Sequence, residues 1–299
     1  MKKIFILFAI IIFSSSALTQ IEKKNFRPER VDEATPATFT GYNNLGVRVI
    51  VRANDNKLAI EYFKKALVLK PDCFVCKMNL GRSMLRLGRL DESIAIFNEL
   101  LEQAPGDAEV YSSLGEAVNN KGQFQKSLPI FEKAFELGLK DAFTLTNYSI
   151  ALQKTGELKK ALKYLDLSLK IDDSLAETHS NRGIVLFQLG KIKKALSALS
   201  KADSLKPNNK HILSNLGVVF DSMGKHKHAR ELYQTAVNLD PGFAIAQYNL
   251  ASNFLETGDR DMAYKKLNLL KTMDNDLADE LQWMIWGKFV VNASSRKIQ

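Results

Sequence analysis

The 299-residue sequence is poor in cysteine, proline and glycine, and each shortage excludes a class of protein. Two cysteines are too few for a disulfide-rich secreted scaffold. Seven prolines and 16 glycines exclude a collagen or a proline-rich linker. The rest of the composition, 45% hydrophobic and 25% charged, is that of a folded chain with a sizeable core. The net charge of +9 raises the question of an acidic partner without answering it.

Short catalytic motifs are absent as well. The sequence has no P-loop, no GxGxxG after a strand, no GxSxG and no HExxH. Its four histidines, His179, His211, His226 and His228, have no recurring carboxylate partner, and lysines flank the last two. We therefore expect no enzyme, no cofactor, no metal site and no small-molecule substrate.

Long apolar runs are missing except at the N-terminus. Two lysines precede ten apolar residues at 4–13, and small residues around Ala17 follow. This order is typical of a secretory signal peptide, and the run is shorter than the roughly 20 residues of a membrane span. An uncleaved membrane anchor is the alternative. We expect a signal peptide over 1–19, cleaved after Ala17 or Thr19, a flexible leader over 20–40, and a secreted or periplasmic protein.

Most of the remaining sequence repeats every 34 residues. Glycine recurs at Gly88, Gly122, Gly156, Gly190, Gly224 and Gly258. A small residue stands seven positions before each of them, at Gly81, Gly115, Ser149, Gly183, Gly217 and Ala251. Nine positions after each stands a large apolar residue: Phe97, Phe131, Leu165, Leu199, Tyr233 and Leu267. Several slots held in register over six copies indicate a repeat array.

Each copy has the pattern of two amphipathic helices. Ile212, Leu216 and Phe220 recur at helical spacing, and Ala229 and Tyr233 continue the pattern after a loop at 223–225. Small residues are expected where the helices cross, because a larger side chain would push the backbones apart. The loop glycine ends the first helix, and a proline after the second helix stops it.

The period, the small-residue slots and the terminal prolines resemble tetratricopeptide repeats. The clearest copies are Asn215-Leu216-Gly217 with Ala229, Tyr233, Ala236 and Pro241, and Asn79-Leu80-Gly81 with Phe97 and Pro105. An irregular first copy starts near Asn44-Leu45-Gly46, with one extra residue in the loop around Asn54-Asp55. The copies number seven: 41–73, 74–107, 108–141, 142–175, 176–209, 210–243 and 244–275. Arg182, in place of the usual leucine, and Pro129, inside a second helix, depart from the family pattern.

The resemblance implies an all-α fold, a right-handed α-solenoid of seven helix-turn-helix repeats. No copy can bury its apolar stripe alone, so the copies must stack and the last one needs a cover. The spacing of Leu277, Leu281 and Ile285 predicts a capping helix over 276–290, followed by a tail over 291–299. Trp283 and Trp286 either join this packing or form an exposed docking point.

The resemblance also places the first helices on the concave side of the solenoid. One position there is nearly always asparagine, and its amide could hold an extended peptide backbone through a donor and an acceptor. The row is similar to the asparagine ladder in the repeat domain of protein O-GlcNAc transferases, although a polar row can also merely be solvated. The predicted peptide-binding residues are Asn44, Asn79, Asn147, Asn181, Asn215, Asn249, Arg82 and Tyr248.

Cys73 and Cys76 form a CxxC motif between the first two copies, with the second cysteine in the opening turn of a helix. That position lowers a thiol pKa. A redox centre would be expected beside a βαβ unit, and one CxxC supplies only two of the four ligands of a structural zinc site. A structural disulfide or a buried thiol pair is the leading interpretation, and thiol–disulfide catalysis is the alternative.

These observations predict an exported, non-enzymatic adaptor or scaffold that binds a peptide segment or a partner protein in its groove. One alternative is a redox protein acting through Cys73 and Cys76. Another is a structural component of a cell-envelope assembly, docked through its tryptophans or through the basic outer face around Lys193. Nucleic acid is disfavoured because the chain is expected to be exported and has no known binding motif. Contact of the basic face with a membrane surface is a weaker alternative.

Overall fold

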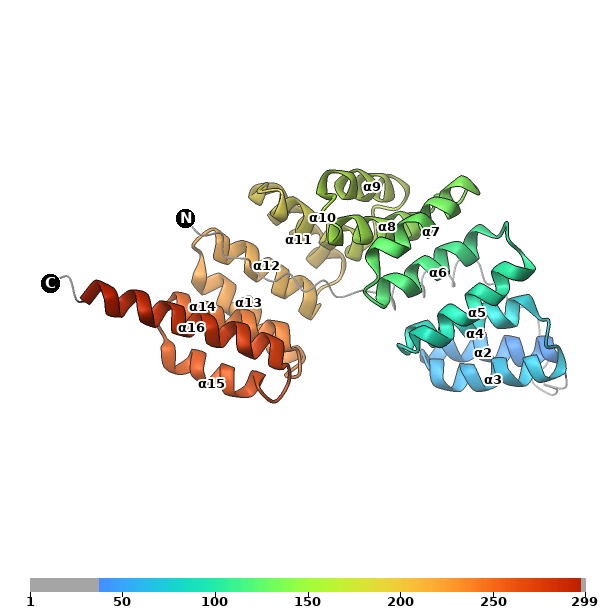
Figure 1. The fold of residues 1–299 in the computed structure, drawn as a ribbon, viewed down its shortest axis with the longest axis horizontal. Helices are drawn as coiled ribbons and strands as arrows, with labels where there is room; N and C mark the ends of the chain where they lie inside the picture. Colours follow the sequence, from blue (N-terminus) through green and yellow to red (C-terminus); the bar gives the residue numbers. More distant parts are fainter. Residues whose placement is uncertain (1–37, 297–299) are drawn as a thin grey trace. The chain divides into compact units, whose positions relative to one another are not determined.

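The computed structural model describes residues 38–296, with side chains placed up to Trp286. All the regular elements of this range are helices, fifteen in number and labelled α2 to α16 (Figure 1). The predicted signal peptide and most of the predicted leader lie outside the described residues. The absence of strands from 38–296 and the succession of helical hairpins confirm the predicted all-α repeat fold.

Fourteen of the helices pair into seven hairpins, and a longer helix follows. The first helices of the hairpins are α2 (Phe39–Ala53), α4 (Phe74–Arg86), α6 (Ala108–Asn120), α8 (Ala142–Lys154), α10 (Ala176–Gln188), α12 (Lys210–Ser222) and α14 (Ala244–Glu256). The second helices are α3 (Asn56–Leu69), α5 (Leu90–Gln103), α7 (Phe124–Glu136), α9 (Leu158–Ile171), α11 (Ile192–Leu205), α13 (His226–Leu239) and α15 (Arg260–Leu270). The last helix is α16 (Asn275–Arg296).

The array divides into two compact units between Asp173 and Ser174. The N-terminal unit, described over 38–173, contains four hairpins from α2 to α9. The C-terminal unit, described over 174–296, contains three hairpins from α10 to α15 and ends in α16. Within each unit the first helices of successive hairpins contact one another, α4 with α6 and α6 with α8, and α10 with α12 and α12 with α14.

The turn inside each hairpin depends on the recurrent loop glycine. Gly224 has a φ of 72°, in the left-handed region that glycine adopts at little cost. Its N–H donates to the carbonyl of Asp221 over 2.9 Å, and the N–H of Lys225 donates to that of Phe220 over 2.9 Å. These bonds satisfy carbonyls that the end of α12 would otherwise leave unpaired, so the glycine frame sets where each first helix stops.

The two helices of a hairpin meet where a small residue faces a large one. In four hairpins a glycine of the first helix lies against an aromatic ring of the second, in the pairs Gly46–Phe63, Gly81–Phe97, Gly115–Phe131 and Gly217–Tyr233. These four rings are at most 2% exposed. The small-residue slot read from the sequence therefore provides the space for the largest buried side chains of the core.

The extra residue of the first hairpin lies in its first helix and not in the loop, which differs from the prediction. We expected a longer loop at Asn54-Asp55, but α2 runs on to Ala53 and only these two residues separate it from α3. Asn54 takes the left-handed conformation, with a φ of 51°, that glycine has in the later hairpins. The Asp55 carboxylate then accepts the N–H of Leu58 over 2.9 Å and caps α3.

The helices at the two ends of the described chain extend beyond the predicted segments. Helix α2 begins at Phe39, within the last residues of the predicted leader, after the Thr38 hydroxyl accepts the N–H of Gly41. Helix α16 begins at Asn275 and continues to Arg296, through the predicted cap and into the predicted tail. In the middle of the chain, α7 continues through Pro129 without ending.

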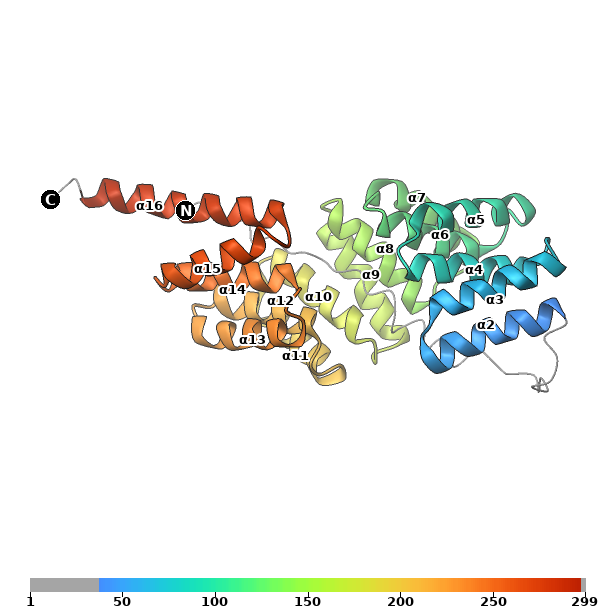
Figure 2. The ribbon, with the colours of Figure 1, turned by 90° about the horizontal axis from the view of Figure 1, so that it is seen from below.

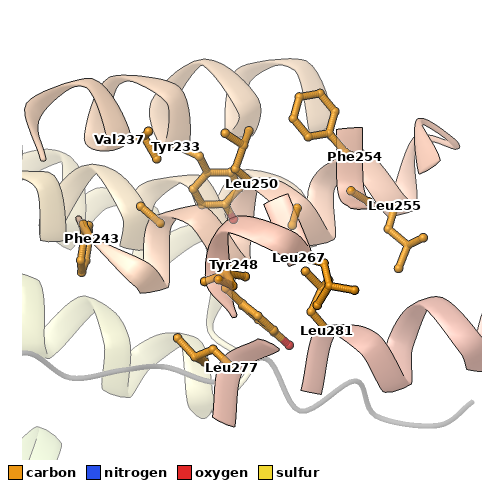
Figure 3. Packing of buried hydrophobic residues seen from close by; sticks show 14 of the residues in the cluster. Tyr233, Val237, Phe243, Tyr248, Leu250, Phe254, Leu255, Leu267, Leu277 and Leu281 are labelled. Atoms are coloured by element: carbon orange, nitrogen blue, oxygen red, sulfur yellow. The ribbon is translucent and has the colours of Figure 1, made fainter. Parts of the chain in front are cut away.

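The C-terminal cap buries one face of α16 against the last hairpin. Leu277, Ala278, Leu281 and Ile285 are at most 5% exposed and belong to the core cluster shared with α14 and α15. Figure 2 shows α16 lying along this hairpin, and Figure 3 shows Leu277 and Leu281 beside residues of α14. The cap replaces the next repeat that an internal hairpin would have, as expected for an array in which no copy is stable alone.

Candidate functional site

The predicted asparagine row lies on the first helices, but much of it is buried. Asn147, Asn181 and Asn249 are each 5% exposed, whereas Asn44, Asn79 and Asn215 are half-buried. The sequence suggested a polar row open to a guest. The three buried members are instead almost completely withdrawn from solvent.

Three of these amides connect neighbouring hairpins. Each donates from Nδ2 to the residue that stands just before the asparagine of the preceding hairpin: Asn79 to Asn43 Oδ1 (2.9 Å), Asn215 to Ser180 Oγ (3.4 Å) and Asn249 to Ser214 Oγ (3.0 Å). Such a bond uses one of the two N–H donors of each amide. The row thus has a structural role between first helices, and the peptide-binding role of its half-buried members stays a prediction.

Asn147 departs from this pattern, because its amide makes no such bond to Ser112, the residue before the equivalent position of the preceding hairpin. The Ser112 hydroxyl bonds to Thr144 Oγ1 over 2.7 Å instead. Asn147 Nδ2 is buried and meets no hydrogen-bond acceptor among the described residues. The backbone carbonyl of Asn147 does accept a bond, from Asn119 Nδ2 over 2.8 Å, which joins α8 to α6.

Tyr248 belongs to the cap rather than to a peptide-binding surface, which corrects the sequence prediction. Its side chain is 3% exposed and extends from α14 toward α16 (Figure 3). The phenol donates to Glu280 Oε1 over 2.8 Å and lies 3.2 Å from the Met284 sulfur. The amphipathic cap covers this part of α14, and the sequence alone did not indicate which side of α14 would be covered.

Arg82 lies in a polar cluster on the N-terminal unit. Its guanidinium donates to Ser113 Oγ over 3.4 Å and to Glu109 Oε2 over 3.2 Å, and its side chain is 25% exposed. Arg86 follows one helical turn later on α4, and its Nη1 lies 3.5 Å from Asn56 Oδ1. The predicted site residue Arg82 is therefore accessible and linked to α6.

Glu116 of α6 is the unusual member of this cluster. Its side chain is 3% exposed, and Oε1 has no hydrogen-bond partner among the described residues. Burial raises the pKa of this carboxyl to about 8, against the opposing effect of the Arg82 and Arg86 cations. One turn further on, Asn120 Oδ1 is also buried without a partner in the described part of the chain.

Sequence reasoning did not select Glu116 as a site residue, although a signal was present. It stands one position after the small-residue slot, where the other hairpins have Val47, Arg82, Ile150, Ile184, Val218 and Ser252. A carboxylate in a largely apolar column is a departure that needs a physical reason. We call the adjoining surfaces of α4, α6 and α8 that carry this column the first-helix face of the N-terminal unit.

The CxxC motif is a disulfide in the structure. The Cys73 and Cys76 sulfurs are 2.03 Å apart, and the two residues are 6% and 0% exposed. They pack with Ala66 between α3 and α4, and Cys73 Sγ accepts the N–H of Cys76 over 3.2 Å at the start of α4. Burial of both sulfurs favours a structural bridge over the redox alternative, because an exchange reaction requires access to a sulfur.

Two further searches of the described residues were negative. Nowhere in 38–286 do three or more histidine, cysteine or acidic side chains gather in a way that could hold a metal ion. None of the helices from α2 to α16 is both long and apolar enough to cross a membrane.

Family models match two parts of the chain. Residues 51–116 match a model described as "Tetratricopeptide repeat", and residues 151–268 match one described as "Psidin, N-terminal TPR repeats region". Neither of these models is of an enzyme family. No curated protein matches the sequence.

Solved structures with similar folds have low sequence identity to this chain. A chain of the APC/C hetero-tetramer Cut9–Hcn1 aligns with a TM-score of 0.69 and 16% identity, covering 74% of this chain and 44% of that one. A tetratricopeptide repeat protein from Parabacteroides merdae aligns with a TM-score of 0.65 and 14% identity, covering 83% and 98%. Human IFIT1 aligns with a TM-score of 0.65 and 18% identity, covering 83% and 64%.

This chain thus spans less than half of the matched Cut9–Hcn1 chain and nearly all of the Parabacteroides protein. At these identities the alignments establish the fold alone. Together with the two family matches and the seven hairpins, they show that the chain belongs to the tetratricopeptide repeat proteins.

Proposed function

We propose that the protein is an exported adaptor that holds a segment of a partner protein against the first helices of its repeats. The main support for this proposal is a set of buried polar atoms on the first-helix face of the N-terminal unit that have no hydrogen-bond partner among the described residues. Glu116 Oε1, Asn120 Oδ1 and Asn147 Nδ2 supply both acceptors and a donor.

Leaving such atoms unpaired is costly. Each buried, unsatisfied polar group costs about 1–3 kcal/mol of stability, and native proteins keep few of them. A bound peptide would offset this cost, since every peptide group carries one donor and one acceptor. The half-buried Asn79 and Asn215 supply additional amide groups on first helices, one in each unit.

Export is part of the proposal and rests on the sequence. A basic start, a ten-residue apolar run and small residues near Ala17 have the order of a signal peptide. The disulfide between Cys73 and Cys76 fits an oxidising compartment, where such bonds persist.

A peptide selection tests the adaptor function. A protein of residues 20–299 would be used to select binding peptides from a random library. The affinity of a selected peptide would then be compared between the parent protein and its variants. Asn79→Ala and Phe143→Ala change the first helices α4 and α8 of the N-terminal unit, and Lys160→Ala changes the exposed side of α9 in the same unit.

We expect the two first-helix substitutions to weaken binding by about fivefold or more, as for the loss of one hydrogen bond or apolar contact. Lys160→Ala should leave affinity within about twofold, as expected for an exposed charge. Failure to select any peptide, or equal affinities for all variants, would contradict the proposal.

A second role is favoured by the outer side of α16. Trp283 and Trp286 are 80% and 61% exposed, and exposed tryptophans are common in binding surfaces. They are the two tryptophans of the sequence, so intrinsic tryptophan fluorescence reports on this helix alone. If α16 docks to an assembly, adding the partner should protect the fluorescence of both tryptophans from quenching by acrylamide. Unchanged quenching would exclude this surface.

A further inference from the structure

The exposed side of α16 carries specific information about the partner that docks there. Trp283 and Trp286 are 80% and 61% exposed, whereas Leu281 and Ile285 on the other side of the helix are buried. That buried side packs against α14 and α15. Two large rings on adjacent turns form an exposed patch of the kind that marks an interaction site.

Two acidic residues stand in line with the tryptophans. Asp276, Asp279, Trp283 and Trp286 are spaced by three, four and three residues, which places them along one side of a helix. All four are exposed. Side chains at these spacings are neighbours on a helix surface, so Asp279 lies between Asp276 and Trp283. We call these four residues the acid–tryptophan stripe.

The acids of the stripe have no counterpart in the described part of the chain. Neither Asp276 nor Asp279 forms an ion pair with a described residue. No lysine or arginine occurs between Asn275 and Trp286, although the whole chain has a net charge of +9.

The helix dipole accounts for only one of these acids. Asp276 lies in the first turn of α16, where the dipole favours a negative charge, and Asp279 lies beyond it. Two like charges three residues apart also repel each other. A cation bound at the stripe would relieve this repulsion.

We propose that the acid–tryptophan stripe docks a basic segment of a partner protein, whose arginine side chains stack on the indole rings and pair with the two aspartates. The inference rests on the docking role of α16 proposed above and names the chemistry of the partner. Tryptophan is the aromatic side chain that attracts cations most strongly. Arginine suits the stripe because its planar group stacks on a ring while its N–H groups reach a carboxylate.

Other segments suit the stripe less well. The aspartates repel an acidic segment, and a neutral segment leaves their charge unpaired. Tryptophan rings are also common at membrane interfaces, but basic residues attract a protein to anionic lipid. The charges of Asp276 and Asp279 are of the opposite sign, so they favour a basic protein segment over an anionic membrane.

The charge and the tryptophan content of the chain make the proposal easy to test. The net charge of +9 repels a cationic peptide, so its binding requires a local acidic site. Trp283 and Trp286 are the two tryptophans of the sequence, and their fluorescence therefore reports binding at the stripe itself.

The experiment titrates a protein of residues 20–299 with capped hexaarginine, hexalysine and hexaglutamine, and follows tryptophan fluorescence and its quenching by acrylamide. Hexaarginine should bind at least about tenfold more tightly than hexaglutamine and about threefold more tightly than hexalysine, and it should protect both rings from acrylamide. Asp279→Asn and Trp283→Leu should each weaken hexaarginine binding by about threefold, with Trp286 as the reporter in the second variant.

Glu231→Gln is the matched control, because it removes the same charge from an exposed acid of α13 in the same unit. Its affinity for hexaarginine should stay within about twofold of the parent. The inference is overturned if hexaglutamine binds as tightly as hexaarginine, or if Asp279→Asn and Glu231→Gln have equal effects. It is also overturned if phosphatidylserine vesicles protect the tryptophans and hexaarginine does not. Each of these results leaves the docking role of α16 standing, which fails separately if the partner assembly does not protect the tryptophans.

Discussion

The ring of Tyr233 fills the space that a side chain at Gly217 would need. A Cβ atom added to Gly217 would lie 2.4 Å from Cε1 of Tyr233, well inside van der Waals contact. Gly217 is on α12 and Tyr233 on α13, and the tyrosine is 2% exposed. This pair shows why the small residue of the 34-residue frame and the large residue sixteen positions later occur together.

Gly217→Ala should therefore destabilise the C-terminal unit by about 1–3 kcal/mol, the usual cost of overpacking a core. The measurement is the urea midpoint followed by far-ultraviolet circular dichroism. The hairpin of α8 and α9 combines Ser149 with Leu165 at the equivalent positions. By analogy with that hairpin, adding Tyr233→Leu to Gly217→Ala should recover part of the lost stability. If the double variant loses as much stability as the two single variants together, the steric account is refuted.

Glu116→Gln should stabilise the protein more at high pH than at low pH. The folded-state pKa of Glu116 is about 8, above its ordinary value of 4.5. Between these values the folded state holds a proton that the unfolded state releases, so the unfolding free energy of the parent falls as pH rises. Glutamine has no such proton. The advantage of the variant should grow from pH 4.5 to pH 8 by a few kcal/mol, since each unit between the two pKa values corresponds to about 1.4 kcal/mol.

The comparison needs urea unfolding at pH 5 and pH 9. Glu92→Gln is a suitable control, because Glu92 is exposed and its pKa is lowered by Arg89. That variant should not gain stability with rising pH. A Glu116→Gln effect of the same size at both pH values would mean that the carboxyl is not desolvated.

Asn249→Ala and Asn147→Ala should differ in cost although both amides are buried. The first removes the bond from Asn249 Nδ2 to Ser214 Oγ, and Ser214 is 2% exposed, so its hydroxyl is left unpaired. We expect a loss of about 1–2 kcal/mol. Asn147 Nδ2 has no acceptor among the described residues. Asn147→Ala should therefore cost about 1 kcal/mol less stability than Asn249→Ala. Equal losses would show that Asn147 has a partner in solution.

Replacing both cysteines by alanine should lower stability without affecting peptide binding. The bridge between Cys73 and Cys76 closes a very short loop, for which chain entropy gives about 2 kcal/mol. In the folded protein both sulfurs should resist reduction by millimolar dithiothreitol, because both are buried. Rapid reduction together with insulin reductase activity would restore the redox hypothesis.

Much of the fold could be predicted because the frame residues act locally. Gly224 ends α12 by a backbone conformation, and Gly217 and Tyr233 meet within one hairpin, so spacing along the chain determines both features. Leu277, Leu281 and Ile285 likewise indicated a cap through their helical period. The frame did not reveal the division of the array at Asp173, because a repeat period is the same on both sides of such a boundary.

The site was harder to predict because it depends on neighbours from other hairpins. The amide of Asn249 is engaged by Ser214, 35 residues away, and the phenol of Tyr248 by Glu280, 32 residues away. The repeat period alone does not say which side chains of neighbouring helices face one another once the hairpins stack. Glu116 was visible as an acid in an apolar column, but its raised pKa comes first from its burial, against the opposing effect of Arg82 and Arg86 from another helix.

The position of the guest tests the central claim most directly. Photo-reactive benzoylphenylalanine would replace Phe143 on the first helix α8 or Tyr62 on the second helix α3, both half-buried aromatic residues of the N-terminal unit. After irradiation with a selected peptide, mass spectrometry gives the yield of cross-linked product at each site. We predict a product at position 143 and none above background at position 62. A product at position 62 alone would place the guest on the second helices and contradict the account.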